Sequence, residues 1–464
     1  MQPVLFGIGA YLLVQFALGM AVSRHIASEA DYVLAGRKLG VALAAFSIFA
    51  TWFGAETVVG AAGTIYSEGL AGGSADPFGY GLCLIVVGLA IAAPLWRRKY
   101  TTFGDLFRDR FGPGVERLAV ILMIPTSILW AAAQIRAFGQ VVSASSDLDV
   151  EVAITAAAVF VIAYTVAGGL LADVVTDFVQ GVAVIIGLVL LLVAVANANG
   201  GGIAELGQLI DPARLQFFSL GGTGLLATIE AWAVPICGSL LAVELLSRIL
   251  GCQSAATART ATLLGAAIYL LVGSIPAVLG LVGPALVPGL DEPEQLIATL
   301  AQQHLTTFFY VLFAGALISA ILSTVDSCLL ASGSLAAHNL VLPVKPDLSE
   351  RAKIWCARSA VLVFGVVAYL IALYAGGIDK LVATASAFGS AGIFVVGLFG
   401  LFTTFGRALS AYAALVAGMA VWVAGEYVLA WSTPYLASLA SAFVAYVGAA
   451  WLTYGERPAV AAAN

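Results

Sequence analysis

One long apolar stretch, residues 306–338, carries hydroxyl and carboxylate side chains at helical spacing. Its polar residues fall on one side of a helix and are Ser319, Ser323, Asp326, Ser327 and Ser334. Serine hydroxyls can bond back to their own helix, but a carboxylate at the bilayer centre costs about 3 kcal/mol or more, so Asp326 needs a partner or a function. Hydroxyls, carbonyls and carboxylates are the ligands that a small hard cation prefers. The stretch therefore predicts a cation site inside a membrane-spanning helix.

Two other apolar stretches contain residues that interrupt a helix. The segment FGAETVVGAAG contains Gly54 and Glu56, and WAVPICGSLL contains Pro235 and Gly238. Proline removes a backbone donor and glycine tolerates unwound dihedrals, so backbone carbonyls and amides become available to a cation or a solute. The alternative is that glycine packs helices and proline kinks one. Because the two stretches lie five spans apart, they favour an inverted-repeat transporter.

Other charged residues have simpler interpretations. Asp173 and Asp177 lie four residues apart in LLADVVTDFVQ. We expect Asp173 to be solvated near the cytoplasmic surface and Asp177 to lie one turn deeper, where the helix dipole is an alternative to a bound cation. Glu244 and Arg248 have the spacing of an ion pair along one helix. Gln134 is a candidate for lining a central site.

The elements that hold these residues are predicted to be membrane helices. Hydrophobic residues make up 61% of the 464 positions and charged residues only 10%, against roughly 25% charged in soluble proteins. Thirteen apolar runs reach the roughly 20 residues that span a bilayer. They cover residues 4–23, 41–66, 77–96, 117–143, 150–168, 172–197, 224–249, 261–284, 306–338, 353–375, 381–404, 407–430 and 434–454. The chain is therefore predicted to be an all-α integral membrane protein.

The basic residues orient these spans. With the N-terminus outside, 17 of the 20 Lys and Arg residues fall at cytoplasmic positions, and only Arg136, Arg214 and Lys380 do not. We expect a multi-pass plasma (inner) membrane protein with its C-terminus in the cytoplasm.

The composition also excludes several functions. A net charge of −6 without a basic patch excludes nucleic-acid binding, and no phosphate-binding loop or histidine cluster indicates an enzyme. We expect no organic cofactor and no obligate protein partner. The partners implied are a small-molecule solute, a small cation and the lipid bilayer.

The order of several motifs resembles the sodium:solute symporter family, whose members have the LeuT-type inverted-repeat fold. The motifs are DYVLAGR (31–37), WFGAETVVGAAG (52–63), TTFGDLFRDRFG (101–112), YTVAGGLLADVVTDFVQ (164–180), LLSRILG (245–251) and SAILSTVDS (319–327). The resemblance implies a single transporter domain over residues 1–464, with a peripheral helix (4–23), two inverted repeats with broken first helices (41–197 and 224–404) and two C-terminal helices (407–454).

The resemblance also implies where sodium binds. The usual sodium site of the family combines carbonyls of the first repeat helix with a carbonyl and two hydroxyls of the eighth. The matching groups are the carbonyls of Ala50, Phe53 and Ala320 and the hydroxyls of Ser323 and Thr324. Some members bind a second sodium ion, and the matching residues are Asp177, Ser323, Asp326 and Ser327, with Asp326 able to take a proton instead.

The solute is less closely specified. Proline carriers of the family have an Asp where this chain has Trp52, and the sugar-type Asn and Tyr are replaced by Pro235 and Gly238. The candidate solute-binding residues are Glu56, Thr57, Gln134, Gly238 and Ser239. Glu56 either accepts hydrogen bonds from a solute or binds amides freed at the helix break. We expect a sodium-coupled symporter that imports a small polar organic solute (amino acid, osmolyte, vitamin or sugar-like) by alternating access. The alternatives are a proton-coupled symporter and a non-transporting solute sensor.

Overall fold

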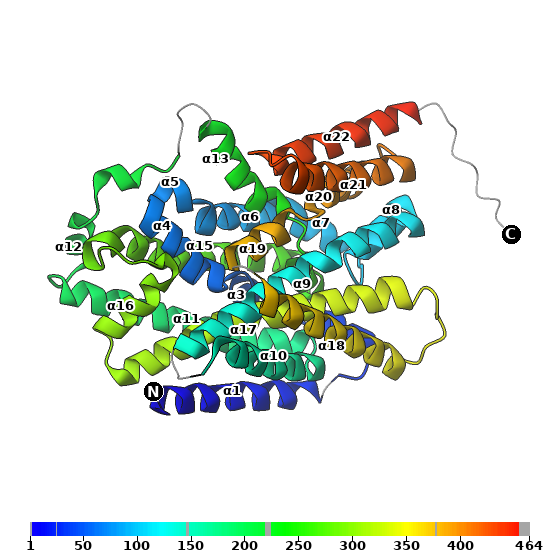
Figure 1. Cartoon of the computed structure of the whole chain (residues 1–464). Coiled ribbons are helices and arrows are strands. Elements are labelled where there is room, and N and C mark those ends of the chain that lie inside the picture. Colours follow the sequence, from blue (N-terminus) through cyan, green and yellow to red (C-terminus); the bar gives the residue numbers. More distant parts are fainter. Residues whose placement is uncertain (1, 25, 145–147, 219–223, 376–377, 454–464) are drawn as a thin grey trace.

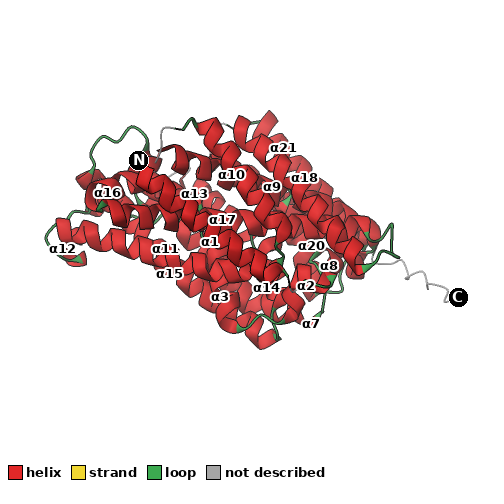
Figure 2. Cartoon of the chain, turned by 90° about the horizontal axis from the view of Figure 1, so that it is seen from below, coloured by secondary structure: helices red, strands yellow, loops and turns green. Residues whose placement is uncertain are grey.

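The computed structural model describes residues 2–24, 26–144, 148–218, 224–375 and 378–453, and its regular elements are all helices (Figure 2). Eleven helical segments are long and apolar enough to cross a bilayer. A twelfth span is the pair formed by α3 (Val41–Trp52) and the helical segment Glu56–Glu68, which bend by 59° at the break between them. The thirteenth predicted run is α1 (Gln2–Ser23), of which Gly9–Ser23 is counted as a shorter apolar helix. The prediction of an all-α membrane protein is confirmed.

The other helices follow the predicted order. The unbroken spans are α9 (Pro113–Ala144), α10 (Val150–Ala167), α11 (Leu170–Ala198), α15 (Ala255–Leu286), α17 (Thr307–Leu335), α18 (Glu350–Tyr374), α21 (Ala408–Val423) and α22 (Pro434–Leu452). Spans built from two or more segments are η2 (Glu56–Gly60) with α4 (Ala61–Glu68) after α3; η3 (Ala75–Gly79), α6 (Tyr80–Val86), η4 (Val87–Ile91) and α7 (Ala92–Arg97); α13 (Gly224–Ala233), η6 (Val234–Gly238) and α14 (Val243–Gly251); and α19 (Ile378–Ala387) with α20 (Ser390–Phe402). Shorter elements are α2 (Glu29–Leu34), η1 (Ala35–Arg37), α5 (Leu70–Gly73), α8 (Gly104–Phe111), α12 (Ile203–Gln208), η5 (Pro212–Leu215), η7 (Pro293–Gln295), α16 (Leu296–His304), η8 (Ala336–Val341) and η9 (Ala424–Val428).

Helix α17 lies in the middle of the bundle and positions the candidate site. Every residue from Phe313 to Leu335 is buried. The hydroxyls and the carboxylate of this helix therefore face other helices and not lipid, as polar groups within a membrane require. It packs against α9, α11, α14 and α18, while α3 packs against α11, α14 and α17. The broken helix α3, the acidic helix α11 and the helix α14 therefore meet on α17.

The peripheral helices lie at opposite edges of the bundle. Helix α1 runs along one edge against α10, α11 and α17, whereas α21 and α22 pack against each other at the opposite edge (Figure 1). Both edges expose large apolar side chains such as Phe6, Leu13, Val444 and Trp451. Apolar side chains exposed along helices of spanning length are suited to contact with lipid.

Candidate functional site

The break in the second span is held by one buried carboxylate. Helix α3 ends at Trp52, and the side chain of Glu56 turns back to accept hydrogen bonds from the Gly54 amide (3.2 Å) and from Nε2 of Gln134 (2.6 Å). The side-chain oxygen of Gln134 in turn accepts from the Ala55 amide at 3.0 Å. Glu56 and Gln134 thus bind amides freed by the break, as one of the two interpretations of Glu56 expects. A Cβ atom on Gly54 would come closer than 3.0 Å to both side chains, so a larger residue here would force them to shift.

The seventh span is also interrupted. Its first half ends in the π-helical turn η6, and residues 239–242 separate this turn from α14. A Cβ atom on Gly238 would collide with the carbonyl oxygen of Ser386, so glycine allows the two backbones to approach closely. The interruption leaves Ser239 facing a central cavity.

Four of the five residues expected to bind sodium lie together. The Ser323 hydroxyl donates to the carbonyls of Ala50 (2.5 Å) and Ala320 (3.2 Å). The Thr324 hydroxyl donates to Ala320 O at 3.3 Å and to the carbonyl of Thr51 at 3.0 Å. The end of α3 and the middle of α17 therefore bring together a set of carbonyl and hydroxyl oxygens, the ligand type that suits a small hard cation.

Phe53, the fifth residue, is buried, and its ring packs against Phe49 and Tyr269 at centroid distances of 5.1 and 5.7 Å. The hydroxyls of α17 donate to the carbonyls of Ala50 and Thr51. Sequence matching did not single out Thr51.

The four residues expected at a second cation site do not share one set of hydrogen-bond partners. Asp177 and Ser327 both contact the guanidinium group of Arg248, at 3.3 Å for Asp177. Asp326 faces another direction and accepts from the Thr165 hydroxyl at 2.7 Å. Ser323 belongs to the proposed first sodium site, where its hydroxyl donates to the Ala50 carbonyl.

Arg248 corrects two sequence predictions. Its side chain has no exposed surface, and Nη2 binds Asp173 Oδ2 at 2.5 Å. The expected ion pair with Glu244 is wrong, since Arg248 Nη1 donates to the Glu244 backbone carbonyl (2.9 Å) instead of its carboxylate. Asp173 is also buried and not solvated, because it pairs with a residue 75 positions away in the chain.

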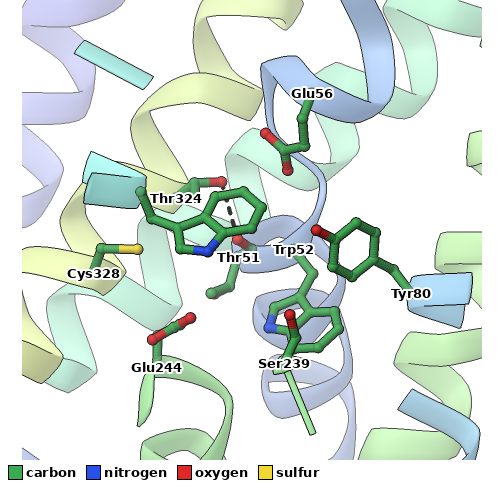
Figure 3. A pocket seen from close by; sticks show the side chains of 9 residues that line it. Thr51, Trp52, Glu56, Tyr80, Ser239, Glu244, Thr324 and Cys328 are labelled. Carbon is green, nitrogen blue, oxygen red and sulfur yellow. Dashed lines mark hydrogen bonds between the residues drawn. The ribbon is translucent and has the colours of Figure 1, made fainter. Parts of the chain in front are cut away.

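A cavity lies between the two helix breaks, and aromatic rings dominate its wall. It is narrow and is lined by Thr51, Trp52, Glu56, Tyr80, Trp130, Ser239, Glu244, Thr324 and Cys328. The rings of Trp52 and Tyr80 meet edge to face at 5.7 Å, and Tyr80 and Trp130 do so at 6.2 Å. Figure 3 shows Glu56 at the top and Glu244 at the lower left of the view, with Tyr80 and Trp52 on the right. No Lys or Arg is among the lining residues.

The cavity contains only part of the predicted solute-binding set. Glu56 and Ser239 line it. Gln134 lies behind Glu56, and Thr57 is fully buried, with its hydroxyl bonded to Tyr269 (2.9 Å) and to Asp76 (3.1 Å). Gly238 lines a neighbouring cavity.

Sequence reasoning missed most of the aromatic wall. Trp52 was noted only because it replaces a family Asp, and neither Tyr80 nor Trp130 has a local signal that distinguishes it from a ring packed in the core. Glu244 was also missed as a lining residue, because its spacing to Arg248 suggested an ion pair. Its carboxylate instead lies 3.4 Å from the Ser127 hydroxyl at the cavity edge.

Three comparisons place the chain among known transporters. The model of the sodium:solute symporter family matches residues 32–420. The high-affinity choline transporters 1 of Drosophila melanogaster and Homo sapiens are 29% and 30% identical over 75% and 74% of this chain. The matches cover 57% and 61% of those two proteins, so the chain spans about three-fifths of their length. A sodium/proline symporter of Staphylococcus aureus is 28% identical over 79% of this chain and 74% of its own length.

Solved structures agree on the fold. A Na⁺-coupled sialic acid symporter in a substrate-bound outward-open state superposes with a TM-score of 0.85 at 18% identity and covers 97% of both chains. Mhp1, a nucleobase-cation-symport-1 family transporter, superposes in its closed conformation with a TM-score of 0.64 at 15% identity, over 92% of this chain and 96% of its own. The fold is therefore that of the LeuT-type transporters. The family and these relatives are transporters, not enzymes.

Proposed function

The chain belongs to the sodium:solute symporter family, and from this premise we propose that it imports a small organic cation of choline-like chemistry together with sodium. The observation that carries the proposal is the aromatic cavity with a carboxylate on each side. A quaternary ammonium group is attracted to the faces of Trp and Tyr rings, and aromatic cages are a recurring way to bind it.

The charges around the cavity argue against other solutes of the family. Glu56 and Glu244 are both buried, and the lining contains no basic residue to accept a carboxylate. An anionic solute would meet two carboxylates and no counter-charge, which disfavours its binding. The carboxylate of a proline-like zwitterion would likewise have no basic side chain to pair with in the cavity.

The proposed coupling ion is sodium, bound by the carbonyls of Ala50, Phe53 and Ala320 and the hydroxyls of Ser323 and Thr324. This assignment is supported by the family and by the cluster of oxygens where α3 meets α17. Thr324 lies both in this cluster and on the cavity wall. An ion bound there would contact both α3 and α17, the helices that form the solute site. The ion would therefore bind more tightly to the conformation in which these helices are together, and this difference in affinity is what couples ion and solute.

The architecture proposed around this site is the one that the resemblance implies. Residues 41–197 and 224–404 form the two inverted repeats, α1 and the last two spans are peripheral, and the N-terminus lies outside a plasma membrane. Sodium entering at 100 mV supplies about 2.3 kcal/mol per charge before any concentration gradient.

Uptake into proteoliposomes tests the proposal. With an inward sodium gradient, radiolabelled choline should accumulate and potassium should not replace sodium. The neutral carbon isostere 3,3-dimethylbutanol should compete poorly, because only the charged headgroup gains from the rings and carboxylates. Accumulation of proline and not choline would refute the solute class. Uptake that ignores sodium but follows a pH gradient would favour the proton-coupled alternative, and binding without accumulation would favour the sensor.

A further inference from the structure

A guanidinium group lies against two of the four residues that the family resemblance matches to a second sodium ion. Arg248 lies on α14, the second half of the seventh span, and has no exposed surface. Its Nη2 contacts carboxylate oxygens of Asp173 and Asp177, both on α11, and the hydroxyl of Ser327 on α17. Asp177 and Ser327 are two of the four residues matched to that second ion.

The remaining donors of Arg248 are also used. Nε donates to the Ser47 hydroxyl at 3.0 Å, and this hydroxyl donates to Asp177 Oδ2 at 2.5 Å. Nη1 donates to the Glu244 carbonyl (2.9 Å) and to Ser247 Oγ (3.3 Å). The planar fork of arginine is thus fixed by α3, α11, α14 and α17 together.

The charges explain why this position matters. Buried carboxylates require positive charge nearby, and Arg248 supplies one such charge from within the chain, closest to Asp173 and also in contact with Asp177. A metal ion bound to Asp177 and Ser327 would lie beside the guanidinium, and the two positive charges would repel in a medium of low dielectric constant. The hydroxyl of Ser327 also already donates to Ser323 O at 2.6 Å.

We propose that Arg248 is a built-in cation that replaces a second sodium ion, so that this chain binds a single coupling sodium. For its meaning in transport the inference rests on the proposed sodium symport. Its physical content is independent of that proposal, because it concerns which positive charge lies against Asp173 and Asp177. Arg248 is then a positioning residue that sets the ion stoichiometry.

Equilibrium binding of ²²Na⁺ to the full-length protein in detergent tests the inference. We expect one ion per wild-type chain and one additional ion per chain in Arg248→Gln, because the carboxylates lose their internal partner. The double variant Asp177→Asn/Arg248→Gln is the matched control, since it removes a carboxylate together with the guanidinium and should bind one ion again. Two ions on the wild type, or no additional ion on Arg248→Gln, would overturn the inference.

Two further readouts separate the possible failures. If the wild type binds no sodium, the sodium coupling proposed above fails. The inference about Arg248 is then decided by the variant alone: a gain of one ion in Arg248→Gln supports a built-in cation, and no gain refutes it. If Arg248→Gln does not fold, Asp177→Asn alone decides the question. That variant should still bind one ion if Arg248 holds the position, whereas loss of one of two bound ions would show that Asp177 binds a second sodium.

Discussion

At the scale of single residues, the cavity wall includes three aromatic rings that can attract a cation. Trp52 touches Tyr80 edge to face and lines the same cavity as Trp130. Because an organic cation gains from each ring face it meets, these side chains contribute to affinity for a charged headgroup and little to affinity for a neutral one. The contribution of each ring can therefore be measured by comparing charged and neutral ligands.

Replacing Trp52 with alanine should weaken choline binding. A lost cation–π contact of about 0.5–2 kcal/mol corresponds to roughly a 2- to 30-fold rise in the apparent Kd. The measurement is the concentration dependence of choline uptake or of Trp fluorescence quenching. Trp52→Phe should retain part of the affinity. Trp355→Ala is the control, because Trp355 is 54% exposed on α18 and lies outside the cavity. Equal losses in Trp52→Ala and Trp355→Ala would contradict the proposed role.

The two hydroxyls of α17 give a second prediction. The double variant Ser323→Ala/Thr324→Ala removes two proposed ligands, so half-maximal uptake should require at least about tenfold more sodium, a change of about 1.4 kcal/mol. Sodium-dependent stabilisation in a thermal melt should fall in parallel. Ser332→Ala is the matched control, since its hydroxyl bonds to the Cys328 and Leu329 carbonyls of its own helix. Unchanged sodium affinity in a folded double variant would refute the assignment.

At the scale of elements, the two helix breaks hold the site open by different means. The break after α3 is capped by Glu56 and Gln134, whereas the break after η6 is accommodated by close approach of Gly238 to the Ser386 carbonyl. Neither break is a simple proline kink, although Pro235 lies in η6. Both breaks therefore depend on glycine at positions where a methyl group has no room.

Gly54→Ala should disturb the first break more than its small volume suggests. The added methyl group would displace the Glu56 carboxylate and the Gln134 amide, and overpacking of this kind costs about 1–3 kcal/mol. We expect a lower melting temperature and weaker choline binding. Gly315→Ala on α17 is the control, because a Cβ atom there meets nothing within 4 Å. Its melting temperature should stay level or rise, since alanine favours a helix over glycine. Similar behaviour of the two variants would argue against a tightly packed break.

At the scale of the whole molecule, the helical spans and the shared face of the α17 hydroxyls could be predicted from the sequence. Long apolar runs have few alternatives to membrane helices, and the hydroxyls of α17 share a face by spacing alone. The partner of Arg248 could not be predicted, because Glu244 is one turn away in sequence whereas Asp173 becomes its neighbour only when α11 packs near α14. The aromatic wall was missed for the same reason: Trp52, Tyr80 and Trp130 come from three different spans.

The orientation in the membrane gives the last prediction. In a background without the partly exposed Cys237 and Cys356, single cysteines can be placed in two exposed loops that flank α17, at Asp291 and Asp347. The Lys and Arg distribution puts residue 291 outside and residue 347 inside. An impermeant maleimide added to intact cells should therefore label Asp291→Cys at once and Asp347→Cys only after permeabilisation. The opposite pattern would mean that the chain has the reverse orientation in the membrane. Asp291 and Glu292 would then face the cytoplasm, and sodium would reach the cavity from the other side. Labelling of both from outside would mean that α17 does not cross the membrane, and the proposed sodium site on it would fall.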